Sequence, residues 1–223
     1  MLGDRLDAWT ASWWVLVVVG LLTGAGVGVG IRSVLARLRR GAVLRPGGVE
    51  IACAVVTAAS LAAGWGTARL VILLWAGWLG VALAAVDLRH HRLPDALTLP
   101  AWGVSAALVV GTSLWSPGSG SVPRAVLAAA LVGGLFWLVW RIAPAAMGRG
   151  DVKLVPALVL LTGYLSWGAA VLGVVLAFVT GSVVSLLGLL SRRMTMRSAL
   201  AFGPHLLAGC WLVLAVPGWS AGG

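Results

Sequence analysis

Long uncharged stretches alternate with short polar segments along the whole chain. A helix that spans a membrane needs about 17 to 25 largely apolar residues, and most of these stretches have such a length. The run Leu154–Ser191 has 38 residues, too many for one span, and its TGYLSWG segment at Thr162–Gly168 predicts a turn. The pattern therefore predicts about eight transmembrane helices, or seven if one of the shortest runs does not span. From the N-terminus, the runs are Ala8–Ile31, Ile51–Ala68, Leu70–Val86, Ala96–Ser116, Ala125–Trp140, Leu154–Ser191 and Ser198–Gly223.

Composition supports the same fold class. Hydrophobic residues make up 61% of the 223 residues and charged residues only 10%, whereas a soluble domain is roughly 25% charged. We therefore predict an all-α polytopic integral membrane protein.

The net charge of +10 raises the question of a nucleic-acid partner, which the placement of the bases answers. Alternate loops collect 13 of the 16 Lys and Arg residues, and short cytoplasmic loops are the ones enriched in these residues. This asymmetry predicts that both chain termini are non-cytoplasmic and that nucleic acid is not a partner. The 13 bases are Arg32, Arg37, Arg39, Arg40, Arg45, Arg89, Arg92, Arg141, Arg149, Lys153, Arg192, Arg193 and Arg197, against Arg5, Arg69 and Arg124 on the other side.

Cysteine and histidine do not form a metal-binding pattern. Cys53 and Cys210 both fall inside apolar runs, where a lone cysteine usually serves as a small buried hydrophobic residue. His90 and His91 are adjacent and would point in different directions on a helix, and His205 lies far along the chain. We therefore expect no metal site.

Three of the six acidic residues lie in two polar segments, VDLRHHRLPD at Val86–Asp95 and GRGDVK at Gly148–Lys153. Ionisable groups at membrane depth are costly and are usually functional. Asp87 ends an apolar run, and a carboxylate at a helix C-terminus opposes the helix dipole, so capping does not explain it. Asp95 and Asp151 each precede an apolar run, and either could cap a helix.

The glycines on either side of Arg149 have two interpretations. Gly148 and Gly150 permit positive φ and a close approach of a substrate backbone, or they simply form an interhelical turn. From Asp151 to Gly163 the expected helix has 13 residues, about 20 Å at 1.5 Å per residue. Since the hydrocarbon core is about 30 Å thick, this helix could hold Asp151 below the headgroups in a water-containing cavity.

The two polar segments, DLRHHRLPDALTLP and GRGDVKL, resemble motifs of the type IV prepilin peptidases, bacterial aspartic membrane proteases of the GxGD class. AFGPHLLAG at Ala201–Gly209 is similar to a third motif in the last span of that family. The resemblance implies that Asp87 and Asp151 are the catalytic pair. It also implies a supporting role for Pro94, Asp95, Gly148, Gly150, Lys153, Gly203 and Pro204.

By the same resemblance, the chain is expected to cleave the leader of pilin-like precursors at the cytoplasmic face of a bacterial inner membrane. The partner would be a precursor with a hydrophobic N-terminal helix, held in the lipid bilayer, and no cofactor would be needed. Longer family members carry two CxxC pairs in their first cytoplasmic loop, associated with N-methylation. Here that loop is RSVLARLRRGAVLRPGG, so cleavage without methylation is expected.

Two regions are expected within the chain. Residues 1–48 would form a transmembrane anchor and a short basic cytoplasmic loop, and residues 49–223 the helical membrane peptidase core. The anchor is expected to remain because Asp4 and Asp7 do not suit a secretory signal.

The rival interpretation is an ion- or proton-coupled transporter that uses Asp87 and Asp151. Transporters usually hold such acids near the bilayer midplane in broken helices. Both acids are expected at helix ends on one side, which favours the peptidase.

Overall fold

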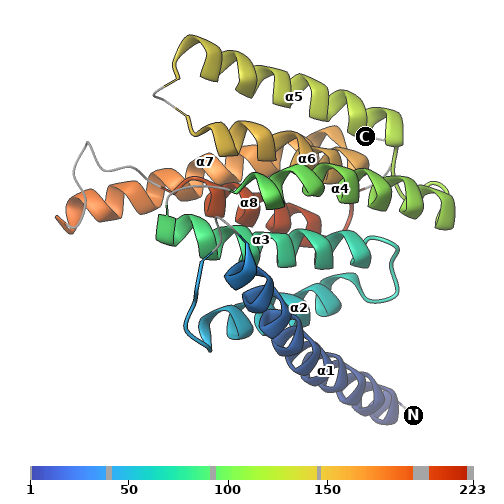
Figure 1. Ribbon diagram of the computed structural model, residues 1–223. Coiled ribbons are helices and arrows are strands. Elements are labelled where there is room, and N and C mark those ends of the chain that lie inside the picture. The colour runs from blue at the N-terminus through green and yellow to red at the C-terminus, as the bar shows by residue number, and fades with distance from the viewer. Residues whose placement is uncertain (1, 39–41, 91–93, 145–146, 193–200, 220–223) are drawn as a thin grey trace.

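The computed structural model describes residues 2–38, 42–90, 94–144, 147–192 and 201–219, with the side chains of residues 2–12 left undescribed. Within this part of the chain all regular structure is helical, as predicted (Figure 1). The helices are α1 (Leu2–Arg37), α2 (Gly48–Gly64), α3 (Leu70–His90), α4 (Asp95–Trp115), α5 (Val122–Ile142), α6 (Arg149–Leu165), α7 (Trp167–Leu190) and α8 (Gly203–Ala215).

Five helices are long and apolar enough to cross a membrane: α3, α4, α5, α7 and the Trp13–Arg37 part of α1. α2 and α8 are apolar but shorter, with 17 and 13 residues, and α6 has 17. The chain therefore has the architecture of a multi-pass membrane protein. The expected eight helices are present, and the number that cross completely stays a prediction, as does the division at residues 48 and 49.

The break between α6 and α7 lies at Ser166, inside the predicted turn segment. The Ser166 hydroxyl accepts a hydrogen bond from the backbone N–H of Ala169 at 2.9 Å and so caps α7. α6 continues two residues beyond Gly163, so the expected 13-residue helix was too short at this end. Its observed length is still only about 25 Å.

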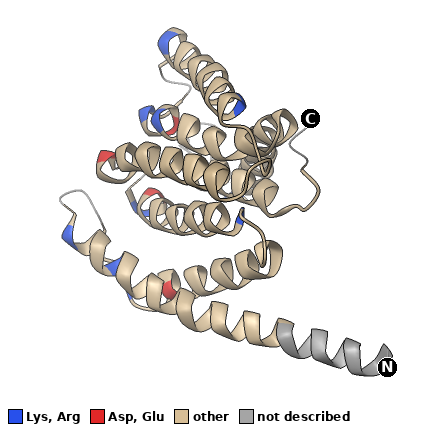
Figure 2. Cartoon of the chain, turned by 90° about the vertical axis from the view of Figure 1, so that its right-hand side faces the viewer, with Lys and Arg blue, Asp and Glu red and all other residues tan. Residues whose placement is uncertain are grey.

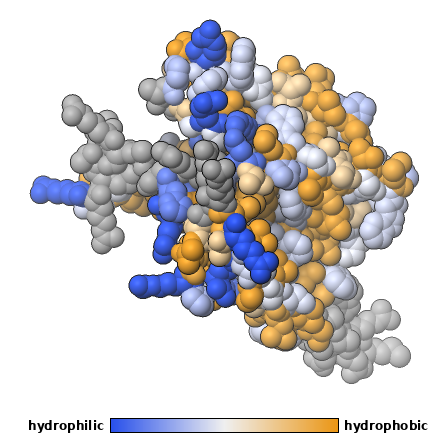
Figure 3. Space-filling model, in the orientation of Figure 1, coloured by the Kyte–Doolittle hydropathy of each residue, from blue (hydrophilic) through white to orange (hydrophobic). Residues whose placement is uncertain are grey.

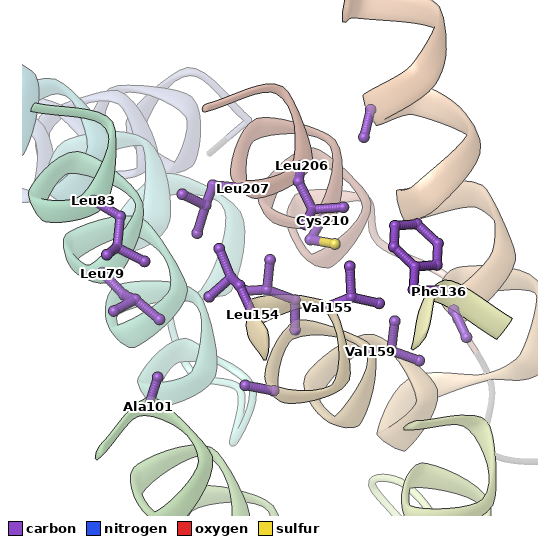
Figure 4. Packing of buried hydrophobic residues seen from close by; sticks show 14 of the residues in the cluster. Leu79, Leu83, Ala101, Phe136, Leu154, Val155, Val159, Leu206, Leu207 and Cys210 are labelled. Atoms are coloured by element: carbon purple, nitrogen blue, oxygen red, sulfur yellow. The ribbon is translucent and has the colours of Figure 1, made fainter. Parts of the chain in front are cut away.

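α6 lies inside the bundle, packed against α4, α5, α7 and α8. Every residue from Leu154 to Leu165 is buried. The helix contributes to two hydrophobic clusters, one of which is drawn in Figure 4. The interior of the protein is thus organised around a helix that carries one of the two polar segments at its start.

α1 packs chiefly on α2 at the edge of the bundle through a row of glycines. A β-carbon on Gly20, Gly24 or Gly28 would lie about 2.5 Å from an atom of α2, whereas Gly26 and Gly30 face open space. Small residues that let two helices approach closely are typical of membrane proteins. Gly20, Gly24 and Gly28 therefore serve helix packing within the chain.

Charged residues gather at one end of the bundle (Figure 2). The end of α3 and the starts of α4, α6 and α8 meet on the same side (Figure 1). Figure 3 shows hydrophilic residues concentrated on that side, while most of the remaining visible surface is hydrophobic or intermediate. The two polar segments therefore meet at one end of the bundle, as predicted.

Candidate active site

Asp87 lies in the last turn of α3, at the end of the bundle where α6 begins (Figure 1). Leu83 precedes it by four residues and so shares its face, and Leu83 belongs to the same buried cluster as Leu154 of α6. Figure 4 shows Leu79 and Leu83 directed toward Leu154. Asp151 precedes Leu154 by three residues, so Asp87 and Asp151 lie at the same end of this buried cluster.

Both carboxylates are withdrawn from solvent, with Asp87 5% and Asp151 8% exposed. Asp151 lies in the first turn of α6, outside the five candidate spans. Burial of its carboxyl, and next the negative charge of Asp87, raise the pKa of Asp151 from its usual 3.8 to about 7. Two acids 64 residues apart in sequence therefore form one electrostatically coupled pair.

Gly148 occupies the N-cap position of α6 and adjoins the Asp151 carboxylate. A β-carbon on Gly148 would lie 2.9 Å from Oδ2 of Asp151, a distance too short for ordinary packing. Gly148 has φ −67°, and Gly150 lies within the helix and is not among the glycines of positive φ. Neither glycine therefore adopts a positive φ, so that part of the first interpretation is wrong, and the close approach of a substrate backbone stays a prediction.

Asp95 is not the N-cap of α4, so that expectation is also wrong. Pro94 holds the N-cap position with extended backbone angles and no side-chain cap, and Asp95 is the first helical residue. Proline fixes φ near −65°, which suits this entry into the helix. The Asp95 carboxylate remains close to the positive end of the helix dipole.

An ion pair joins the two polar segments directly. Lys153 Nζ lies 2.7 Å from Oδ1 of Asp95, with the two side chains 36% and 53% exposed. The indole N–H of Trp102, on α4, donates to the backbone oxygen of Lys153 at 2.8 Å. The start of α6 is therefore tied to α4 two residues after Asp151.

A second contact at the start of α6 comes from α5. The Arg149 guanidinium lies 5.6 Å from the centre of the Trp140 ring, within reach of a cation–π interaction. Sequence reasoning missed both Trp102 and Trp140, since each meets α6 only through the fold. Their sole signal in the sequence is position, since Trp102 lies about two turns inside one predicted helix and Trp140 ends another.

Gly203 and Pro204 begin α8 at the same end of the bundle. Leu206 and Leu207 follow in the cluster that holds Leu83 and Leu154. The first turn of α8 therefore borders the region of the two acids.

No metal-ligand cluster occurs among the described residues, where three or more His, Cys, Asp or Glu side chains do not come together. Cys53 and Cys210 are buried free cysteines, as predicted. His91 and Leu93, two positions of the sequence motifs, lie outside the described residues.

Residues 71–186 match the type IV leader peptidase family. The chain belongs to this family. The matched segment includes Asp87, Asp95 and Asp151, whereas Gly203 and Pro204 lie beyond its end. The family resemblance inferred from the sequence motifs is confirmed.

Several proteins named prepilin leader peptidase/N-methyltransferase are similar to this leader peptidase family member. The protein of Aeromonas salmonicida (strain A449) is 32% identical over 162 residues, covering 72% of this chain and 53% of the relative. That of Pseudomonas putida is 30% identical over 171 residues, covering 74% and 57%, and that of Dickeya chrysanthemi is 38% identical over 150 residues, covering 63% and 50%. The chain thus spans about half the length of these curated relatives. No solved structure gives a significant match.

Proposed function

We propose that this chain is an aspartic endopeptidase that removes the leader peptide from type IV prepilin-like precursors. The observation that carries the proposal is the buried pair of Asp87 and Asp151, held at adjoining helix ends within the family-matched segment. The same location supports the peptidase over a transporter, because both acids lie at helix ends and not at mid-helix.

The chemistry follows from two carboxyls that share one proton. Like charges held close together cannot both ionise, so one acid stays protonated near neutral pH. The ionised acid takes a proton from a water molecule as its oxygen attacks the scissile carbonyl. The protonated acid hydrogen-bonds the carbonyl oxygen and stabilises the tetrahedral oxyanion. When the peptide C–N bond breaks, the pair returns a proton to the leaving amine, and no covalent intermediate forms.

The substrate would be a precursor whose leader precedes a hydrophobic helix, cleaved at the cytoplasmic face of a bacterial inner membrane. In this proposal the charged end of the bundle faces the cytoplasm, since it carries most of the described bases (Figure 2). A cysteine placed at His90 should therefore react with an impermeant thiol reagent only from the cytoplasmic side, in a background without Cys53 and Cys210. Labelling from the outer side alone would reverse the orientation.

Cleavage is proposed to occur without N-methylation. The chain contains Cys53 and Cys210 and no CxxC pair, so it lacks the cysteine-rich element that the resemblance associates with methylation. Mass spectrometry of the processed precursor, incubated with the purified protein and a methyl donor, should show a free amine. Methyl transfer by the purified chain would refute this part of the proposal.

The decisive experiment replaces each acid by asparagine. Asp87→Asn and Asp151→Asn should each abolish conversion of a co-expressed precursor while the protein remains folded in the membrane. Asparagine keeps the volume of aspartate but cannot accept the proton of water. Because the two acids act as one unit, the double variant should be little worse than either single one.

Asp95→Asn provides the matched control, since it makes the same change at an exposed acid of the same region. It should retain substantial activity. Wild-type turnover by either Asp87→Asn or Asp151→Asn would reject the pair, and loss confined to Asp95→Asn would place the active site elsewhere.

A further inference from the structure

A groove runs along the face of α3 that lies between α2 and α8. Both helices pack on α3, yet they make few contacts with each other, and a space of about 580 Å³ remains between them. This volume lies within the range of small-molecule sites, about 300 to 1,000 Å³. Small side chains of α3 form its floor, namely Ala76, Gly77, Gly80 and Ala84.

One end of the groove is closed by packing. The indole N–H of Trp211, on α8, donates to Ser60 Oγ of α2 at 3.3 Å, and Trp211 lines the groove. At the same level the Val56 side chain of α2 lies so close to Gly77 that it would overlap a β-carbon placed there. A molecule in the groove can therefore extend no further than this end.

The opposite end is polar and basic. It is lined by Arg45, in the segment between α1 and α2, and by Arg89, in the last turn of α3. Both arginines are exposed. Arg89 donates to the backbone oxygen of Val43 at 3.3 Å, which holds it beside the segment that carries Arg45.

The length of the groove corresponds to one leaflet of a bilayer. Twelve residues separate Gly77 from Arg89 along α3, or about 18 Å at 1.5 Å per residue. Half of the hydrocarbon core is about 15 Å. The arginines would therefore lie at headgroup level and Trp211 near the middle of the membrane.

We infer that this groove binds an anionic phospholipid, with one acyl chain along α3 and the headgroup phosphate between Arg45 and Arg89. Apolar walls suit a hydrocarbon chain, and basic pockets between membrane helices bind anionic headgroups. Guanidinium groups also match phosphate geometry well. The site includes neither Asp87 nor Asp151 and does not depend on the proposed peptidase activity.

The test measures lipid retention by the purified full chain in detergent. The protein is incubated with phosphatidylglycerol or with phosphatidylcholine of the same acyl chains, and the lipid that remains after washing is quantified by mass spectrometry. Wild type should retain phosphatidylglycerol preferentially. Arg45→Gln and Arg89→Gln should each weaken retention roughly fivefold, since a basic residue near anionic lipid contributes about that factor.

Matched controls separate the groove from general surface charge and hydrophobicity. Arg141→Gln removes an exposed base at the end of α5, outside the groove, and should leave retention unchanged. Ala52→Phe fills the groove from α2 and should reduce retention, whereas Ala130→Phe on the exposed face of α5 should not. Thermal unfolding checks that each variant is folded, and the arginine variants decide the result if Ala52→Phe does not fold.

Four outcomes would overturn the inference. Equal retention of the two lipids would show that the protein does not recognise the headgroup. Unchanged retention by the Arg45→Gln/Arg89→Gln double variant would show that the arginines do not bind the lipid. Displacement of phosphatidylglycerol by a pilin-like precursor that photocrosslinks to Ala52 would assign the groove to the substrate. Displacement by glycerol phosphate at the same concentration would show an anion site without a chain-binding groove.

Discussion

Gly148 and Asp151 share one small space at the start of α6, where a β-carbon on Gly148 would lie 2.9 Å from Oδ2 of Asp151. Any side chain at position 148 must therefore displace the carboxylate. Glycine is required here to leave room for Oδ2 of Asp151. It is not required for its conformational freedom, since the backbone angles of Gly148 are available to every residue.

Gly148→Ala should reduce cleavage strongly, on the order of 10²-fold, because a displacement of about 1 Å at a reacting group can cost that much. Activity per folded molecule is the measurement. Gly103→Ala on α4 is the control, since a β-carbon there meets nothing within 4 Å. Full activity of Gly148→Ala would mean that the carboxylate need not stay in its present position.

The raised pKa of Asp151 predicts a dependence of cleavage on pH. With its pKa near 7, Asp151 keeps its proton at mildly acidic pH and loses it above neutrality, when both acids become charged. Cleavage should therefore fall as the pH rises above about 7. The measurement is the pH profile of kcat/KM, and a rate that keeps rising to pH 9 would contradict the shared proton.

Stability should change with pH in the same region. The folded protein binds the Asp151 proton up to pH 7, whereas an unfolded chain releases it near 3.8. Its free energy of unfolding should therefore decrease as the pH rises from about 4 to 7. Thermal unfolding in detergent would show this slope, and Asp151→Asn should flatten it while Asp95→Asn should not.

The ion pair of Asp95 and Lys153 should contribute little to stability. Both side chains are partly exposed, and such pairs are usually worth less than about 1 kcal/mol. A double-mutant cycle with Asp95→Asn and Lys153→Gln should give a coupling energy in that range. A coupling of several kcal/mol would show that the pair is shielded from water in the membrane.

Arg124 should contribute much more to stability, because it donates hydrogen bonds to the backbone carbonyls at the end of α6. Its Nε donates to the backbone oxygen of Gly163 at 3.0 Å, and its Nη2 donates to those of Tyr164 and Leu165 at 2.8 and 2.6 Å. These carbonyls lie in the last turn of the helix and have no partner within it. Arg124→Gln should lower the free energy of unfolding by about 1.5–3 kcal/mol.

Arg141→Gln, at the exposed far end of the same helix, is the control for Arg124→Gln. Thermal unfolding in detergent compares the two variants with wild type. Equal stability of the two variants would show that solvent or lipid headgroups can replace the Arg124 contacts.

The helices were well predicted from the sequence because the bilayer thickness sets the number of consecutive apolar residues that a spanning helix needs. The break near Ser166 also followed from a local pattern, whereas the meeting of the two polar segments followed from the charge asymmetry of the loops and from the family resemblance. The prediction for Asp95 missed by one position, since the backbone of Pro94 takes the cap and frees Asp95 to reach Lys153 on another helix.

Other features depend on distances between helices, which no local pattern records. The space that requires Gly148 exists only because the Asp151 side chain turns back toward it. The contact of Arg124 with α6 joins residues about 40 positions apart. The groove beside α3 arises because α2 and α8 both pack on α3 and make few contacts with each other.

The burial of α6 bears on how the protein is made. α6 belongs neither to the five candidate spans nor to the shorter apolar helices, and its first turn carries Arg149, Asp151 and Lys153. Its contacts are with other helices, so the transfer of α6 alone from water into lipid is only weakly favourable during synthesis. We expect α6 to enter the membrane only together with a neighbour such as α5, whose Arg124 secures its far end. The pair of acids would then be assembled late, after the surrounding helices are in place.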